Sequence, residues 1–309
     1  MSTLLLSHPA CLNHLTPAGH PERPDRLRAI EQALEDEKFQ TLARVEAPLG
    51  PLDIVALCHP MDYIEAIRDA SPAEGLVRLD ADTSMSPGSL EAALRAVGGA
   101  KLAVDDVMAG TAKNAFVATR PPGHHTETAR PMGFCLFNNA AIAARYAQKA
   151  HGAERAAIVD FDVHHGNGSQ DIFWSDKSVM YCSTHEMPLY PGTGAKGERG
   201  DFNTIVNAPL SAGDGGDAFR EAFETVILPR LRAFKPDIMI ISAGFDAHMR
   251  DPLANLNLVE ADFSWATQKL MEIADTSAKG RVVSLLEGGY DLQGLSRSVA
   301  AHVTALMQG

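Results

Sequence analysis

The sequence predicts an α/β fold of three layers, in which a central, mostly parallel β-sheet is covered by helices on both faces. Short apolar runs alternate along the chain with longer segments of helical periodicity. The runs are apolar at nearly every position, as in strands that are buried on both faces. Polar residues cluster directly after these runs. We expect a single domain over residues 1–309, because no segment rich in Pro, Gly and Ser marks a boundary.

Five of the apolar runs have the length of strands, and four longer segments have the apolar spacing of helices. The predicted strands cover residues 115–119, 156–161, 179–183, 238–242 and 282–286. The predicted helices cover residues 90–108, 139–150, 218–234 and 260–278. Strands that alternate with helices form parallel units, so this order predicts a parallel sheet between two helical layers.

Composition and charge argue against several classes of partner. Of the 309 residues, 45% are hydrophobic and 21% are charged, which is enough apolar material for a large core. The net charge of −12 argues against nucleic-acid binding through phosphate neutralisation. No stretch approaches the roughly 20 apolar residues of a membrane span. We therefore expect neither nucleic acid nor a membrane as a partner.

The cysteines indicate a reducing compartment. Cys11, Cys58, Cys135 and Cys182 are far apart and form no Cys-x-x-Cys pair, so we expect neither structural disulfides nor a thiolate metal site. The N-terminal run of three leucines is too short for a signal-peptide core and lacks basic flanks. We expect a cytoplasmic protein, and the sequence is compatible with a homo-oligomer.

Polar or glycine-rich residues follow each predicted strand. In chain order they are RPPGHH (120–125), Asp162 with His164, Ser183 with His185, Asp246, and EGGY (287–290). In an open α/β sheet, ligands bind beyond the carboxyl ends of the strands. Because all these residues arrive at one edge of the sheet, we expect a functional site there.

Two carboxylates and one imidazole have the pattern of a metal site. Asp162 and His164 are two residues apart, so both side chains point to the same side of an extended segment. Taken alone, an Asp-x-His pair is more often a helix cap and a loop histidine. Asp246, which follows another strand, is the natural third ligand. A catalytic zinc takes three protein ligands and leaves a position open for water or substrate.

The two adjacent histidines have side chains suited to acid–base chemistry beside such a metal. His124 and His125 follow a stiff Pro-Pro-Gly turn that fixes where the imidazoles point. A histidine there can take a proton from a metal-activated water and return it to a leaving amine. Asp160 and Asn167 suit a supporting layer that accepts the imidazole N–H and fixes its tautomer. A pair of surface histidines is the alternative.

Tyr290 follows Gly288 and Gly289, a pair that permits unusual backbone dihedrals and close approach. A hydroxyl held there can donate to a developing oxyanion. The alternative is a half-buried tyrosine in a turn before a helix.

These motifs resemble those of the zinc-dependent histone deacetylase family, which includes bacterial acetylpolyamine amidohydrolases. The matching stretches are HPERPDRL (20–27), RPPGHH (120–125), GFCLFNNAAIAA (133–144), DFDVHHGNG (160–168), PGTG (191–194), SAGFDAH (242–248) and LEGGYDL (286–292). They occur in order over nearly the whole chain. The resemblance implies an arginase/deacetylase fold, one catalytic domain, and hydrolysis of the N-acyl amide of acyl-lysine or a related small amine.

The resemblance also implies roles for the residues that carry the chemistry. Asp162, His164 and Asp246 match the family's zinc ligands. His125 matches the general base and acid, and His124 its electrostatic partner. Tyr290 matches the residue that polarises the substrate carbonyl.

Two further sets of residues match the family's substrate tunnel and a potassium site. The tunnel residues are Gly133, Phe134, Tyr190 and Leu253. The structural potassium is matched by Asp160, Ser183 and the backbone carbonyls of Asp162, His164 and Thr184.

Several positions narrow the class. Asn167 stands where class I enzymes usually carry Asp, and LEGGY is similar to the class II type. Tyr290 stands where the weakly active class IIa enzymes carry a histidine, so we expect real deacetylase activity.

Two features bear on substrate specificity. Leu253 stands where a polyamine-selective relative carries a glutamate, and residues 60–88 are short for the extended loop of the bacterial polyamine enzymes. These features favour lysine-type or broad specificity over a strict acetylpolyamine enzyme, which stays the main alternative.

Two other functions are weaker. A non-catalytic binding protein of this fold predicts a missing ligand, base or tyrosine, and none is missing. A binuclear manganese hydrolase of the arginase type needs more bridging carboxylates than Asp160, Asp162 and Asp246 provide.

Overall fold

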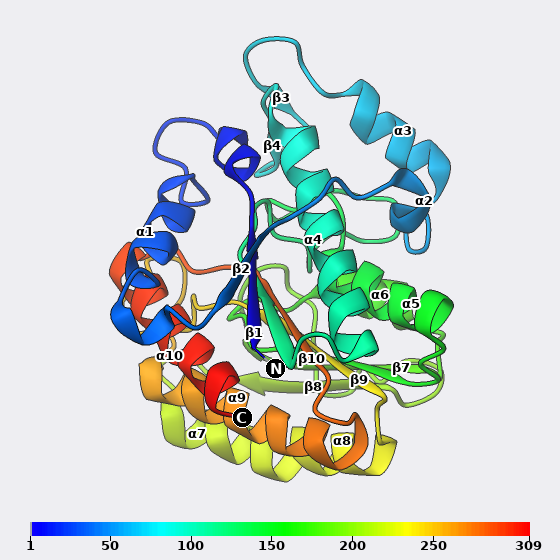
Figure 1. Ribbon diagram of the computed structural model, residues 1–309, viewed down its shortest axis with the longest axis vertical. Coiled ribbons are helices and arrows are strands. Elements are labelled where there is room, and N and C mark those ends of the chain that lie inside the picture. Colours follow the sequence, from blue (N-terminus) through cyan, green and yellow to red (C-terminus); the bar gives the residue numbers. More distant parts are fainter. Residues whose placement is uncertain (1) are drawn as a thin grey trace.

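The centre of the protein is an eight-stranded sheet in which every neighbouring pair of strands is parallel (Figure 1). The computed structural model describes residues 2–309. The strands are β1 (Thr3–Ser7), β2 (Ala43–Glu46), β5 (Asn114–Val117), β6 (Ala156–Asp160), β7 (Val179–Glu186), β8 (Ile205–Leu210), β9 (Ile238–Ala243) and β10 (Val282–Leu286). Their order in the sheet is β2-β1-β5-β10-β9-β6-β7-β8, so β10, which follows the other seven in sequence, lies between β5 and β9.

Helices cover both faces of the sheet (Figure 1). One layer holds α2 (Leu52–Val55), α3 (Met61–Asp69), α4 (Ser89–Ala109), α5 (Asn139–His151) and α6 (Asn167–Phe173). The other holds α1 (Asp25–Ala33), α7 (Gly216–Ala222), α8 (Leu228–Phe234), α9 (Glu260–Ser277) and α10 (Leu292–Gln308). A short hairpin of β3 (Val77–Arg78) and β4 (Ser84–Met85) stands apart from the sheet. The predicted three-layer α/β class is confirmed.

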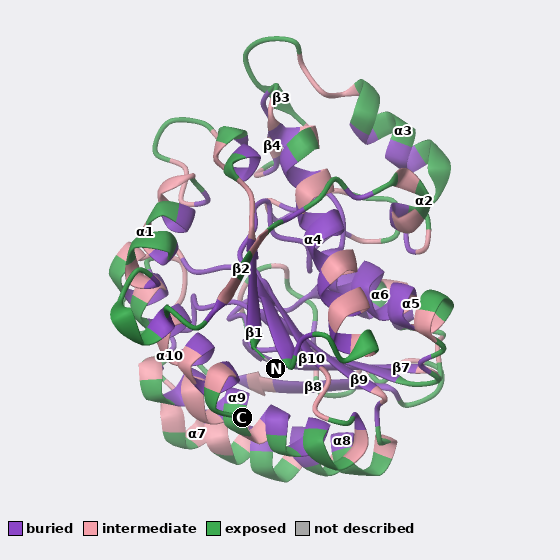
Figure 2. Cartoon of the chain, in the orientation of Figure 1, coloured by how far each residue is buried: buried purple, intermediate pink, exposed green. Residues whose placement is uncertain are grey.

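The strands explain why the apolar runs show no alternation. Successive residues of β6 point to opposite faces, so Ile158 joins the core under α4 and α5 while Val159 joins the core under α9 and α10. Both residues are fully buried. Figure 2 shows this as a buried sheet between helices that expose only their outer sides.

The structure adds elements that periodicity did not reveal. Strands β1, β2 and β8 were not predicted from the sequence. The predicted helix over residues 218–234 is three segments, because a π-helical turn, Phe223–Ile227, joins α7 to α8 just before Pro229. Proline has no N–H to continue a regular helical ladder.

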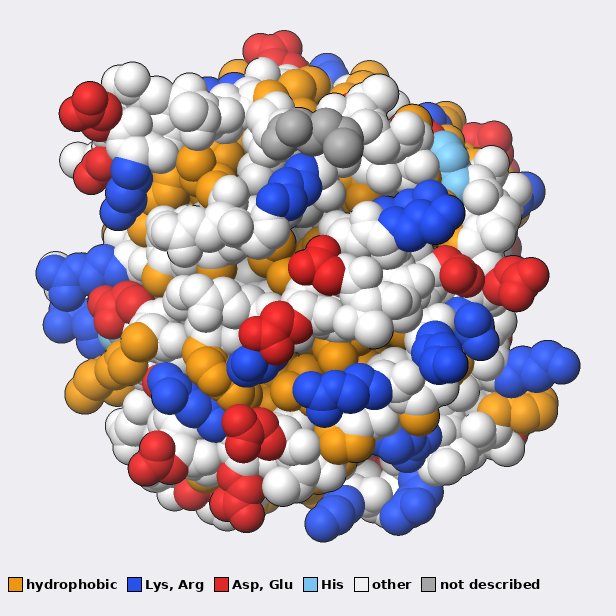
Figure 3. Space-filling model, turned by 60° about the horizontal axis from the view of Figure 1, so that its bottom comes forward, with side chains coloured by type: hydrophobic (Ala, Val, Ile, Leu, Met, Phe, Trp, Pro, Cys, Tyr) orange, Lys and Arg blue, Asp and Glu red, His pale blue; other side chains and the backbone are white. Residues whose placement is uncertain are grey.

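The amino edge of the sheet has a different character from the carboxyl edge. The face in Figure 3 mixes cationic, anionic and hydrophobic side chains. Arg155, Arg232 and Lys235 line a cavity of about 500 Å³ there, next to the C-termini of α8 and α9. Helix C-termini carry partial negative charge, which gives these cations a structural reason to gather.

Two findings bear on the predicted compartment. Cys11, Cys58, Cys135 and Cys182 are buried and unpaired. Within residues 2–309, no helix has the length and apolar content needed to cross a membrane. The compartment and the single-domain organisation stay predictions.

Candidate active site

Asp162, His164 and Asp246 meet at the carboxyl edge of the sheet. One potential ligand atom from each lies within 4.8 Å of those from the other two. β6 and β9 are hydrogen-bonded neighbours, so the turns that follow them lie side by side. His164 Nδ1 is 3.0 Å from Asp246 Oδ2 and 3.3 Å from Asp162 Oδ1. The structure therefore brings together the three residues that the sequence nominates as metal ligands.

Backbone amides hold the two carboxylates in place. Gly288 donates its N–H to Asp162 Oδ2 (2.8 Å), and Val163 donates to Asp246 Oδ1 (2.8 Å). A Cβ at Gly288 would lie 2.2 Å from Asp246 Oδ2 and 2.6 Å from Asp162 Oδ2. Only glycine fits between the end of β10 and these carboxylates.

The electrostatics of this triad favour a bound cation. Burial raises the pKa of Asp246 to about 6, and the neighbouring Asp162 adds to this rise. Burial also raises the pKa of Asp162, but the imidazoles of His124 and His164 outweigh it and hold that pKa well below its usual range. Two fully buried carboxylates sharing one imidazole are costly without a positive charge. Two oxygens and one nitrogen suit zinc or a similar divalent ion.

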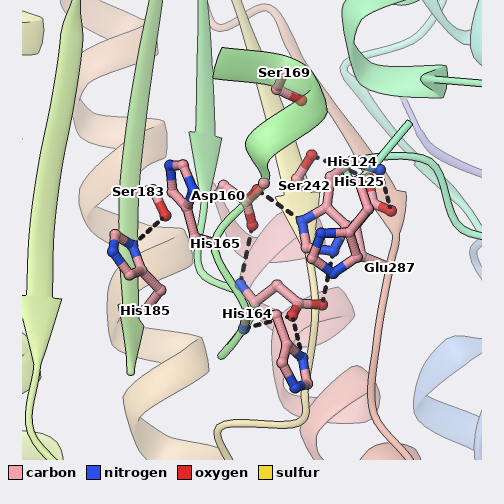
Figure 4. Close-up of polar contacts among 12 residues, drawn as sticks. His124, His125, Asp160, His164, His165, Ser169, Ser183, His185, Ser242 and Glu287 are labelled. Carbon is pink, nitrogen blue, oxygen red and sulfur yellow. Dashed lines mark hydrogen bonds and ion pairs between the residues drawn. The ribbon is translucent and has the colours of Figure 1, made fainter. Parts of the chain in front are cut away.

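The two predicted histidines lie close to His164, and each has its Nδ1 within hydrogen-bond distance of an acceptor; Figure 4 shows His124 beside Asp160. His124 Nδ1 is 2.9 Å from Asp160 Oδ2, and His125 Nδ1 is 2.9 Å from Asn167 Oδ1. Their ring centroids are 4.0 Å apart. Asp160 and Asn167 thus occupy the supporting positions that the sequence suggests.

The two histidines have opposite pKa shifts. Burial lowers the pKa of His124, but the carboxylates of Asp160 and Asp162 outweigh it and raise the pKa well above its usual value. Burial and the neighbouring imidazoles of His124 and His164 hold the pKa of His125 well below its usual value. His125 is therefore suited to act as a neutral base, and His124 is its cationic neighbour.

The tautomer of His125 is set by a chain of contacts. Asn167 Nδ2 donates to Glu127 Oε1 (2.8 Å), so the amide oxygen of Asn167 must face His125. An oxygen accepts only, and His125 Nδ1 therefore carries the hydrogen. The Nε2 lone pair is left free to accept a proton.

A cavity of about 240 Å³ opens above the triad. It is lined by Asp82, His125, Gly133, Phe134, His164, Leu189, Tyr190, Leu253 and Tyr290. All four predicted tunnel residues are among them. Gly133 has φ +58°, and a Cβ there would lie 2.3 Å from the His125 ring. Glycine is required for this wall to approach the histidine.

Tyr290 lines the same cavity and packs against its neighbours. Its ring centroid is 5.8 Å from that of Phe134, and the guanidinium carbon of Arg26 lies 5.0 Å above the ring. Arg26 Nε donates to the carbonyl of Gly289 (2.6 Å). Burial and the Asp246 carboxylate raise the pKa of Tyr290 well above its usual value, so its hydroxyl stays a hydrogen-bond donor.

The sequence analysis missed a buried carboxylate, Glu287, that links two strand ends. Glu287 Oε2 accepts the N–H groups of Gly123 (2.7 Å) and His124 (3.2 Å), and Oε1 accepts the Ser242 hydroxyl (3.0 Å). Burial raises the pKa of Glu287 to about 7. The matched stretch LEGGYDL contained this residue, but its role needed the fold to become visible.

A buried ion network was missed as well. Glu22, from the stretch HPERPDRL, pairs with Arg120 (Nη2–Oε2 2.6 Å) and with Arg26 (3.1 Å). All three side chains are fully buried. The network connects the N-terminal segment to the residues that precede the histidine pair. The wall residues Asp82 and Leu189 also had no signal in the sequence.

The predicted potassium residues lie between β6 and β7. Asp160 and Ser183 are paired in the register of these strands, and Ser183 Oγ is 2.8 Å from His185 Nδ1 (Figure 4). The Thr184 hydroxyl is buried and has no hydrogen-bond partner within residues 2–309. The potassium site stays a prediction.

The fold and the site together define an enzyme of the arginase/deacetylase class. The model of the histone deacetylase domain matches residues 20–306. This chain belongs to the histone deacetylase family.

Relatives and a solved structure agree with this. Histone deacetylase 10, chloroplastic, of Oryza sativa subsp. japonica is 40% identical, over 91% of this chain and 68% of that protein. The histone deacetylase-like amidohydrolase of Pseudomonas aeruginosa is 37% identical, over 88% of this chain and 73% of that protein. The crystal structure of the HDA15 HD domain superposes with a TM-score of 0.94 and 38% identity, covering 99% of this chain and 88% of that one. These findings support deacetylase chemistry and a hydrolase.

Proposed function

We propose that this chain is a zinc-dependent amidohydrolase that removes acetyl or similar acyl groups from acyl-lysine or related small N-acyl amines. The observation that carries the proposal is the convergence of Asp162, His164 and Asp246 at the floor of the cavity that His125 and Tyr290 line. Zinc, when bound by these three residues, would polarise the scissile carbonyl and make an attacking water more acidic.

The side chains around the triad would divide the proton transfers and the charge stabilisation. His125 would accept the water proton at Nε2, because Asn167 keeps its Nδ1 protonated, and would pass that proton to the leaving amine. His124, held in its cationic form by Asp160, would stabilise the negative charge that develops nearby. Tyr290 would donate its hydroxyl hydrogen to the carbonyl oxygen of the substrate.

The cavity walls suit the extended apolar stem of an acyl-lysine. Phe134, Leu189, Tyr190 and Leu253 contribute apolar side chains to the wall. Acetylpolyamine is the second candidate, because the Asp82 carboxylate lines the same cavity and would attract a cationic amine. Comparing kcat/KM for an acetyl-lysine peptide, N-acetylputrescine and a trifluoroacetyl-lysine reporter would separate the two.

Further properties belong to the same proposal. A potassium ion would bind Asp160, Ser183 and the backbone carbonyls of Asp162, His164 and Thr184. The chain would act as one catalytic domain in the cytoplasm, without nucleic acid or membrane as a partner.

The Asp246→Ala variant tests the proposal. We expect zinc binding and turnover to be lost together, because a catalytic zinc needs three protein ligands and only Asp162 and His164 would remain. Bound zinc is measured by elemental analysis and turnover with the acetyl-lysine peptide. Asp217→Ala, at an exposed position of α7, is the matched control. An Asp246→Ala variant that binds no zinc and retains full turnover would overturn the proposal.

A further inference from the structure

We propose that Asp251 is a positioning residue that fixes Tyr290 and the Leu253 wall relative to each other. This inference rests on the proposed function. Asp251 lies in the segment after β9, five residues beyond Asp246, and its side chain is buried. Its hydrogen bonds go to the backbone of Leu253, Tyr290 and Asp291, and it is not among the residues that line the cavity, so its effect would pass through the residues that it holds.

A single carboxylate joins two segments that line the cavity. Asp251 Oδ2 accepts the backbone N–H of Tyr290 at 2.7 Å and that of Asp291 at 3.4 Å. Its other oxygen, Oδ1, accepts the N–H of Leu253 at 3.0 Å. Leu253 follows β9 and Tyr290 follows β10, and both line the cavity.

Tyr290 needs such an anchor because of the residues before it. Gly288 and Gly289 precede it, and Gly289 has φ +122°, a conformation that side chains rarely adopt. Glycine leaves the backbone free to turn in several directions. The hydrogen bond from the Tyr290 N–H to Asp251 fixes the backbone direction at Tyr290, and so the position of its hydroxyl.

The anchor must be a carboxylate. All its donors are backbone N–H groups, which cannot reverse direction, and only a carboxylate has two oxygens that both accept. An amide at this position would present its NH₂ to either Leu253 or Tyr290. No Lys, Arg or His within residues 2–309 forms an ion pair with Asp251, so its hydrogen bonds to these backbone N–H groups are the polar contacts that hold it.

Glu186 provides a matched control from the same region. It is buried at the end of β7, and its Oε2 accepts the N–H of Asn255 (2.7 Å), two residues beyond Leu253. Its Oε1 accepts Asn255 Nδ2 (2.8 Å). In Glu186→Gln the Asn255 amide can turn over and accept from the new NH₂, so this link survives.

The experiment is a double-mutant cycle on the zinc-loaded full chain with the acetyl-lysine peptide. We expect Asp251→Asn to lower kcat by about 10- to 100-fold, because even a small misplacement of a catalytic group can cost roughly 100-fold in rate. Bound zinc should stay at the wild-type level. In the Tyr290→Phe background we expect Asp251→Asn to change kcat by less than about 3-fold, because the hydroxyl it positions is already absent. Glu186→Gln should retain wild-type kcat.

Three results would overturn the inference. One is the same loss of kcat from Asp251→Asn with and without the Tyr290 hydroxyl. The second is an equal loss in Glu186→Gln, which would indicate general loosening of the segment. The third is a wild-type kcat in Asp251→Asn. If Asp251→Asn does not fold, Asp251→Glu, which keeps the charge but displaces the oxygens, takes its place in the cycle.

Failure of the proposed function has a different signature. A zinc-loaded wild-type chain without turnover, or a wild-type rate in Tyr290→Phe, would remove the chemistry on which the inference depends. If Tyr290→Phe lowers kcat as expected, but Asp251→Asn lowers kcat equally with and without the Tyr290 hydroxyl, only the role of Asp251 is rejected.

Discussion

A single amide group determines which nitrogen of His125 can act as a base. Asn167 is held by Glu127 on one side and presents its oxygen to His125 on the other. The sequence nominated Asn167 as a supporting residue. It did not show Glu127, which is 40 residues away along the chain and fixes the direction of the amide.

Replacing this amide by a carboxylate should move the pH dependence of the reaction. In Asn167→Asp a negative charge faces His125 and favours the protonated imidazole, which raises its pKa. Because the base must be neutral to accept a proton, we expect the acidic limb of kcat/KM to shift to higher pH by roughly one unit. The pH–rate profile measures this. An acidic limb at the wild-type position would show that the amide does not set the charge of His125.

At the scale of elements, the strand ends carry the site, and this is the part that sequence predicts well. Four of the five strands whose ends carry a nominated residue were located within two residues of their actual bounds, and β7 extends three residues beyond its predicted end, to Glu186. β1, β2 and β8 were not predicted. β1 is a run of three leucines, and its place between β2 and β5 depends on pairing with residues more than 35 positions away. Such pairing leaves no local pattern.

The contact between the end of β10 and the triad gives a test at this scale. A methyl group in Gly288→Ala would overlap Asp246 Oδ2 and Asp162 Oδ2, so the carboxylates must separate. We expect zinc affinity to fall by about 10-fold or more, a typical effect of disturbing the support of metal ligands. Competition with a chromogenic chelator measures the affinity.

Gly197→Ala is the control for this variant, because a Cβ at Gly197 meets nothing within 4 Å. Wild-type zinc affinity in Gly288→Ala would mean that the carboxylates can move without harm to the site.

At the scale of the whole molecule, buried neutral histidines couple stability to pH. His302 is fully buried between the hydroxyls of Thr267 (2.6 Å) and Ser284 (2.8 Å). Burial lowers its pKa to about 3. As the pH falls, His302 is protonated near pH 6.5 in the unfolded chain but only near pH 3 in the folded protein. The free energy of unfolding is therefore highest above pH 6.5 and decreases as the pH falls toward 3.

The His302→Gln variant should remove this pH dependence. We expect the difference in unfolding free energy between wild type and variant to change between pH 6.5 and 4 with a slope of up to about 1.4 kcal/mol per pH unit. Above pH 7 the difference should be constant, which serves as the internal control. Urea unfolding at a series of pH values provides the measurement. A difference that does not vary below pH 6.5 would contradict the assignment.

The position of β10 has a consequence for how the protein is made. A nascent chain that has left the ribosome only as far as residue 280 already carries Asp162, His164 and Asp246, but its strands form two half-sheets. The edges of β5 and β9 face each other without the strand that belongs between them, and such edges can pair with other chains. Insertion of β10 closes this gap and brings Gly288 to the carboxylates in one step. The same strand therefore seals the sheet and completes the support of the candidate metal ligands.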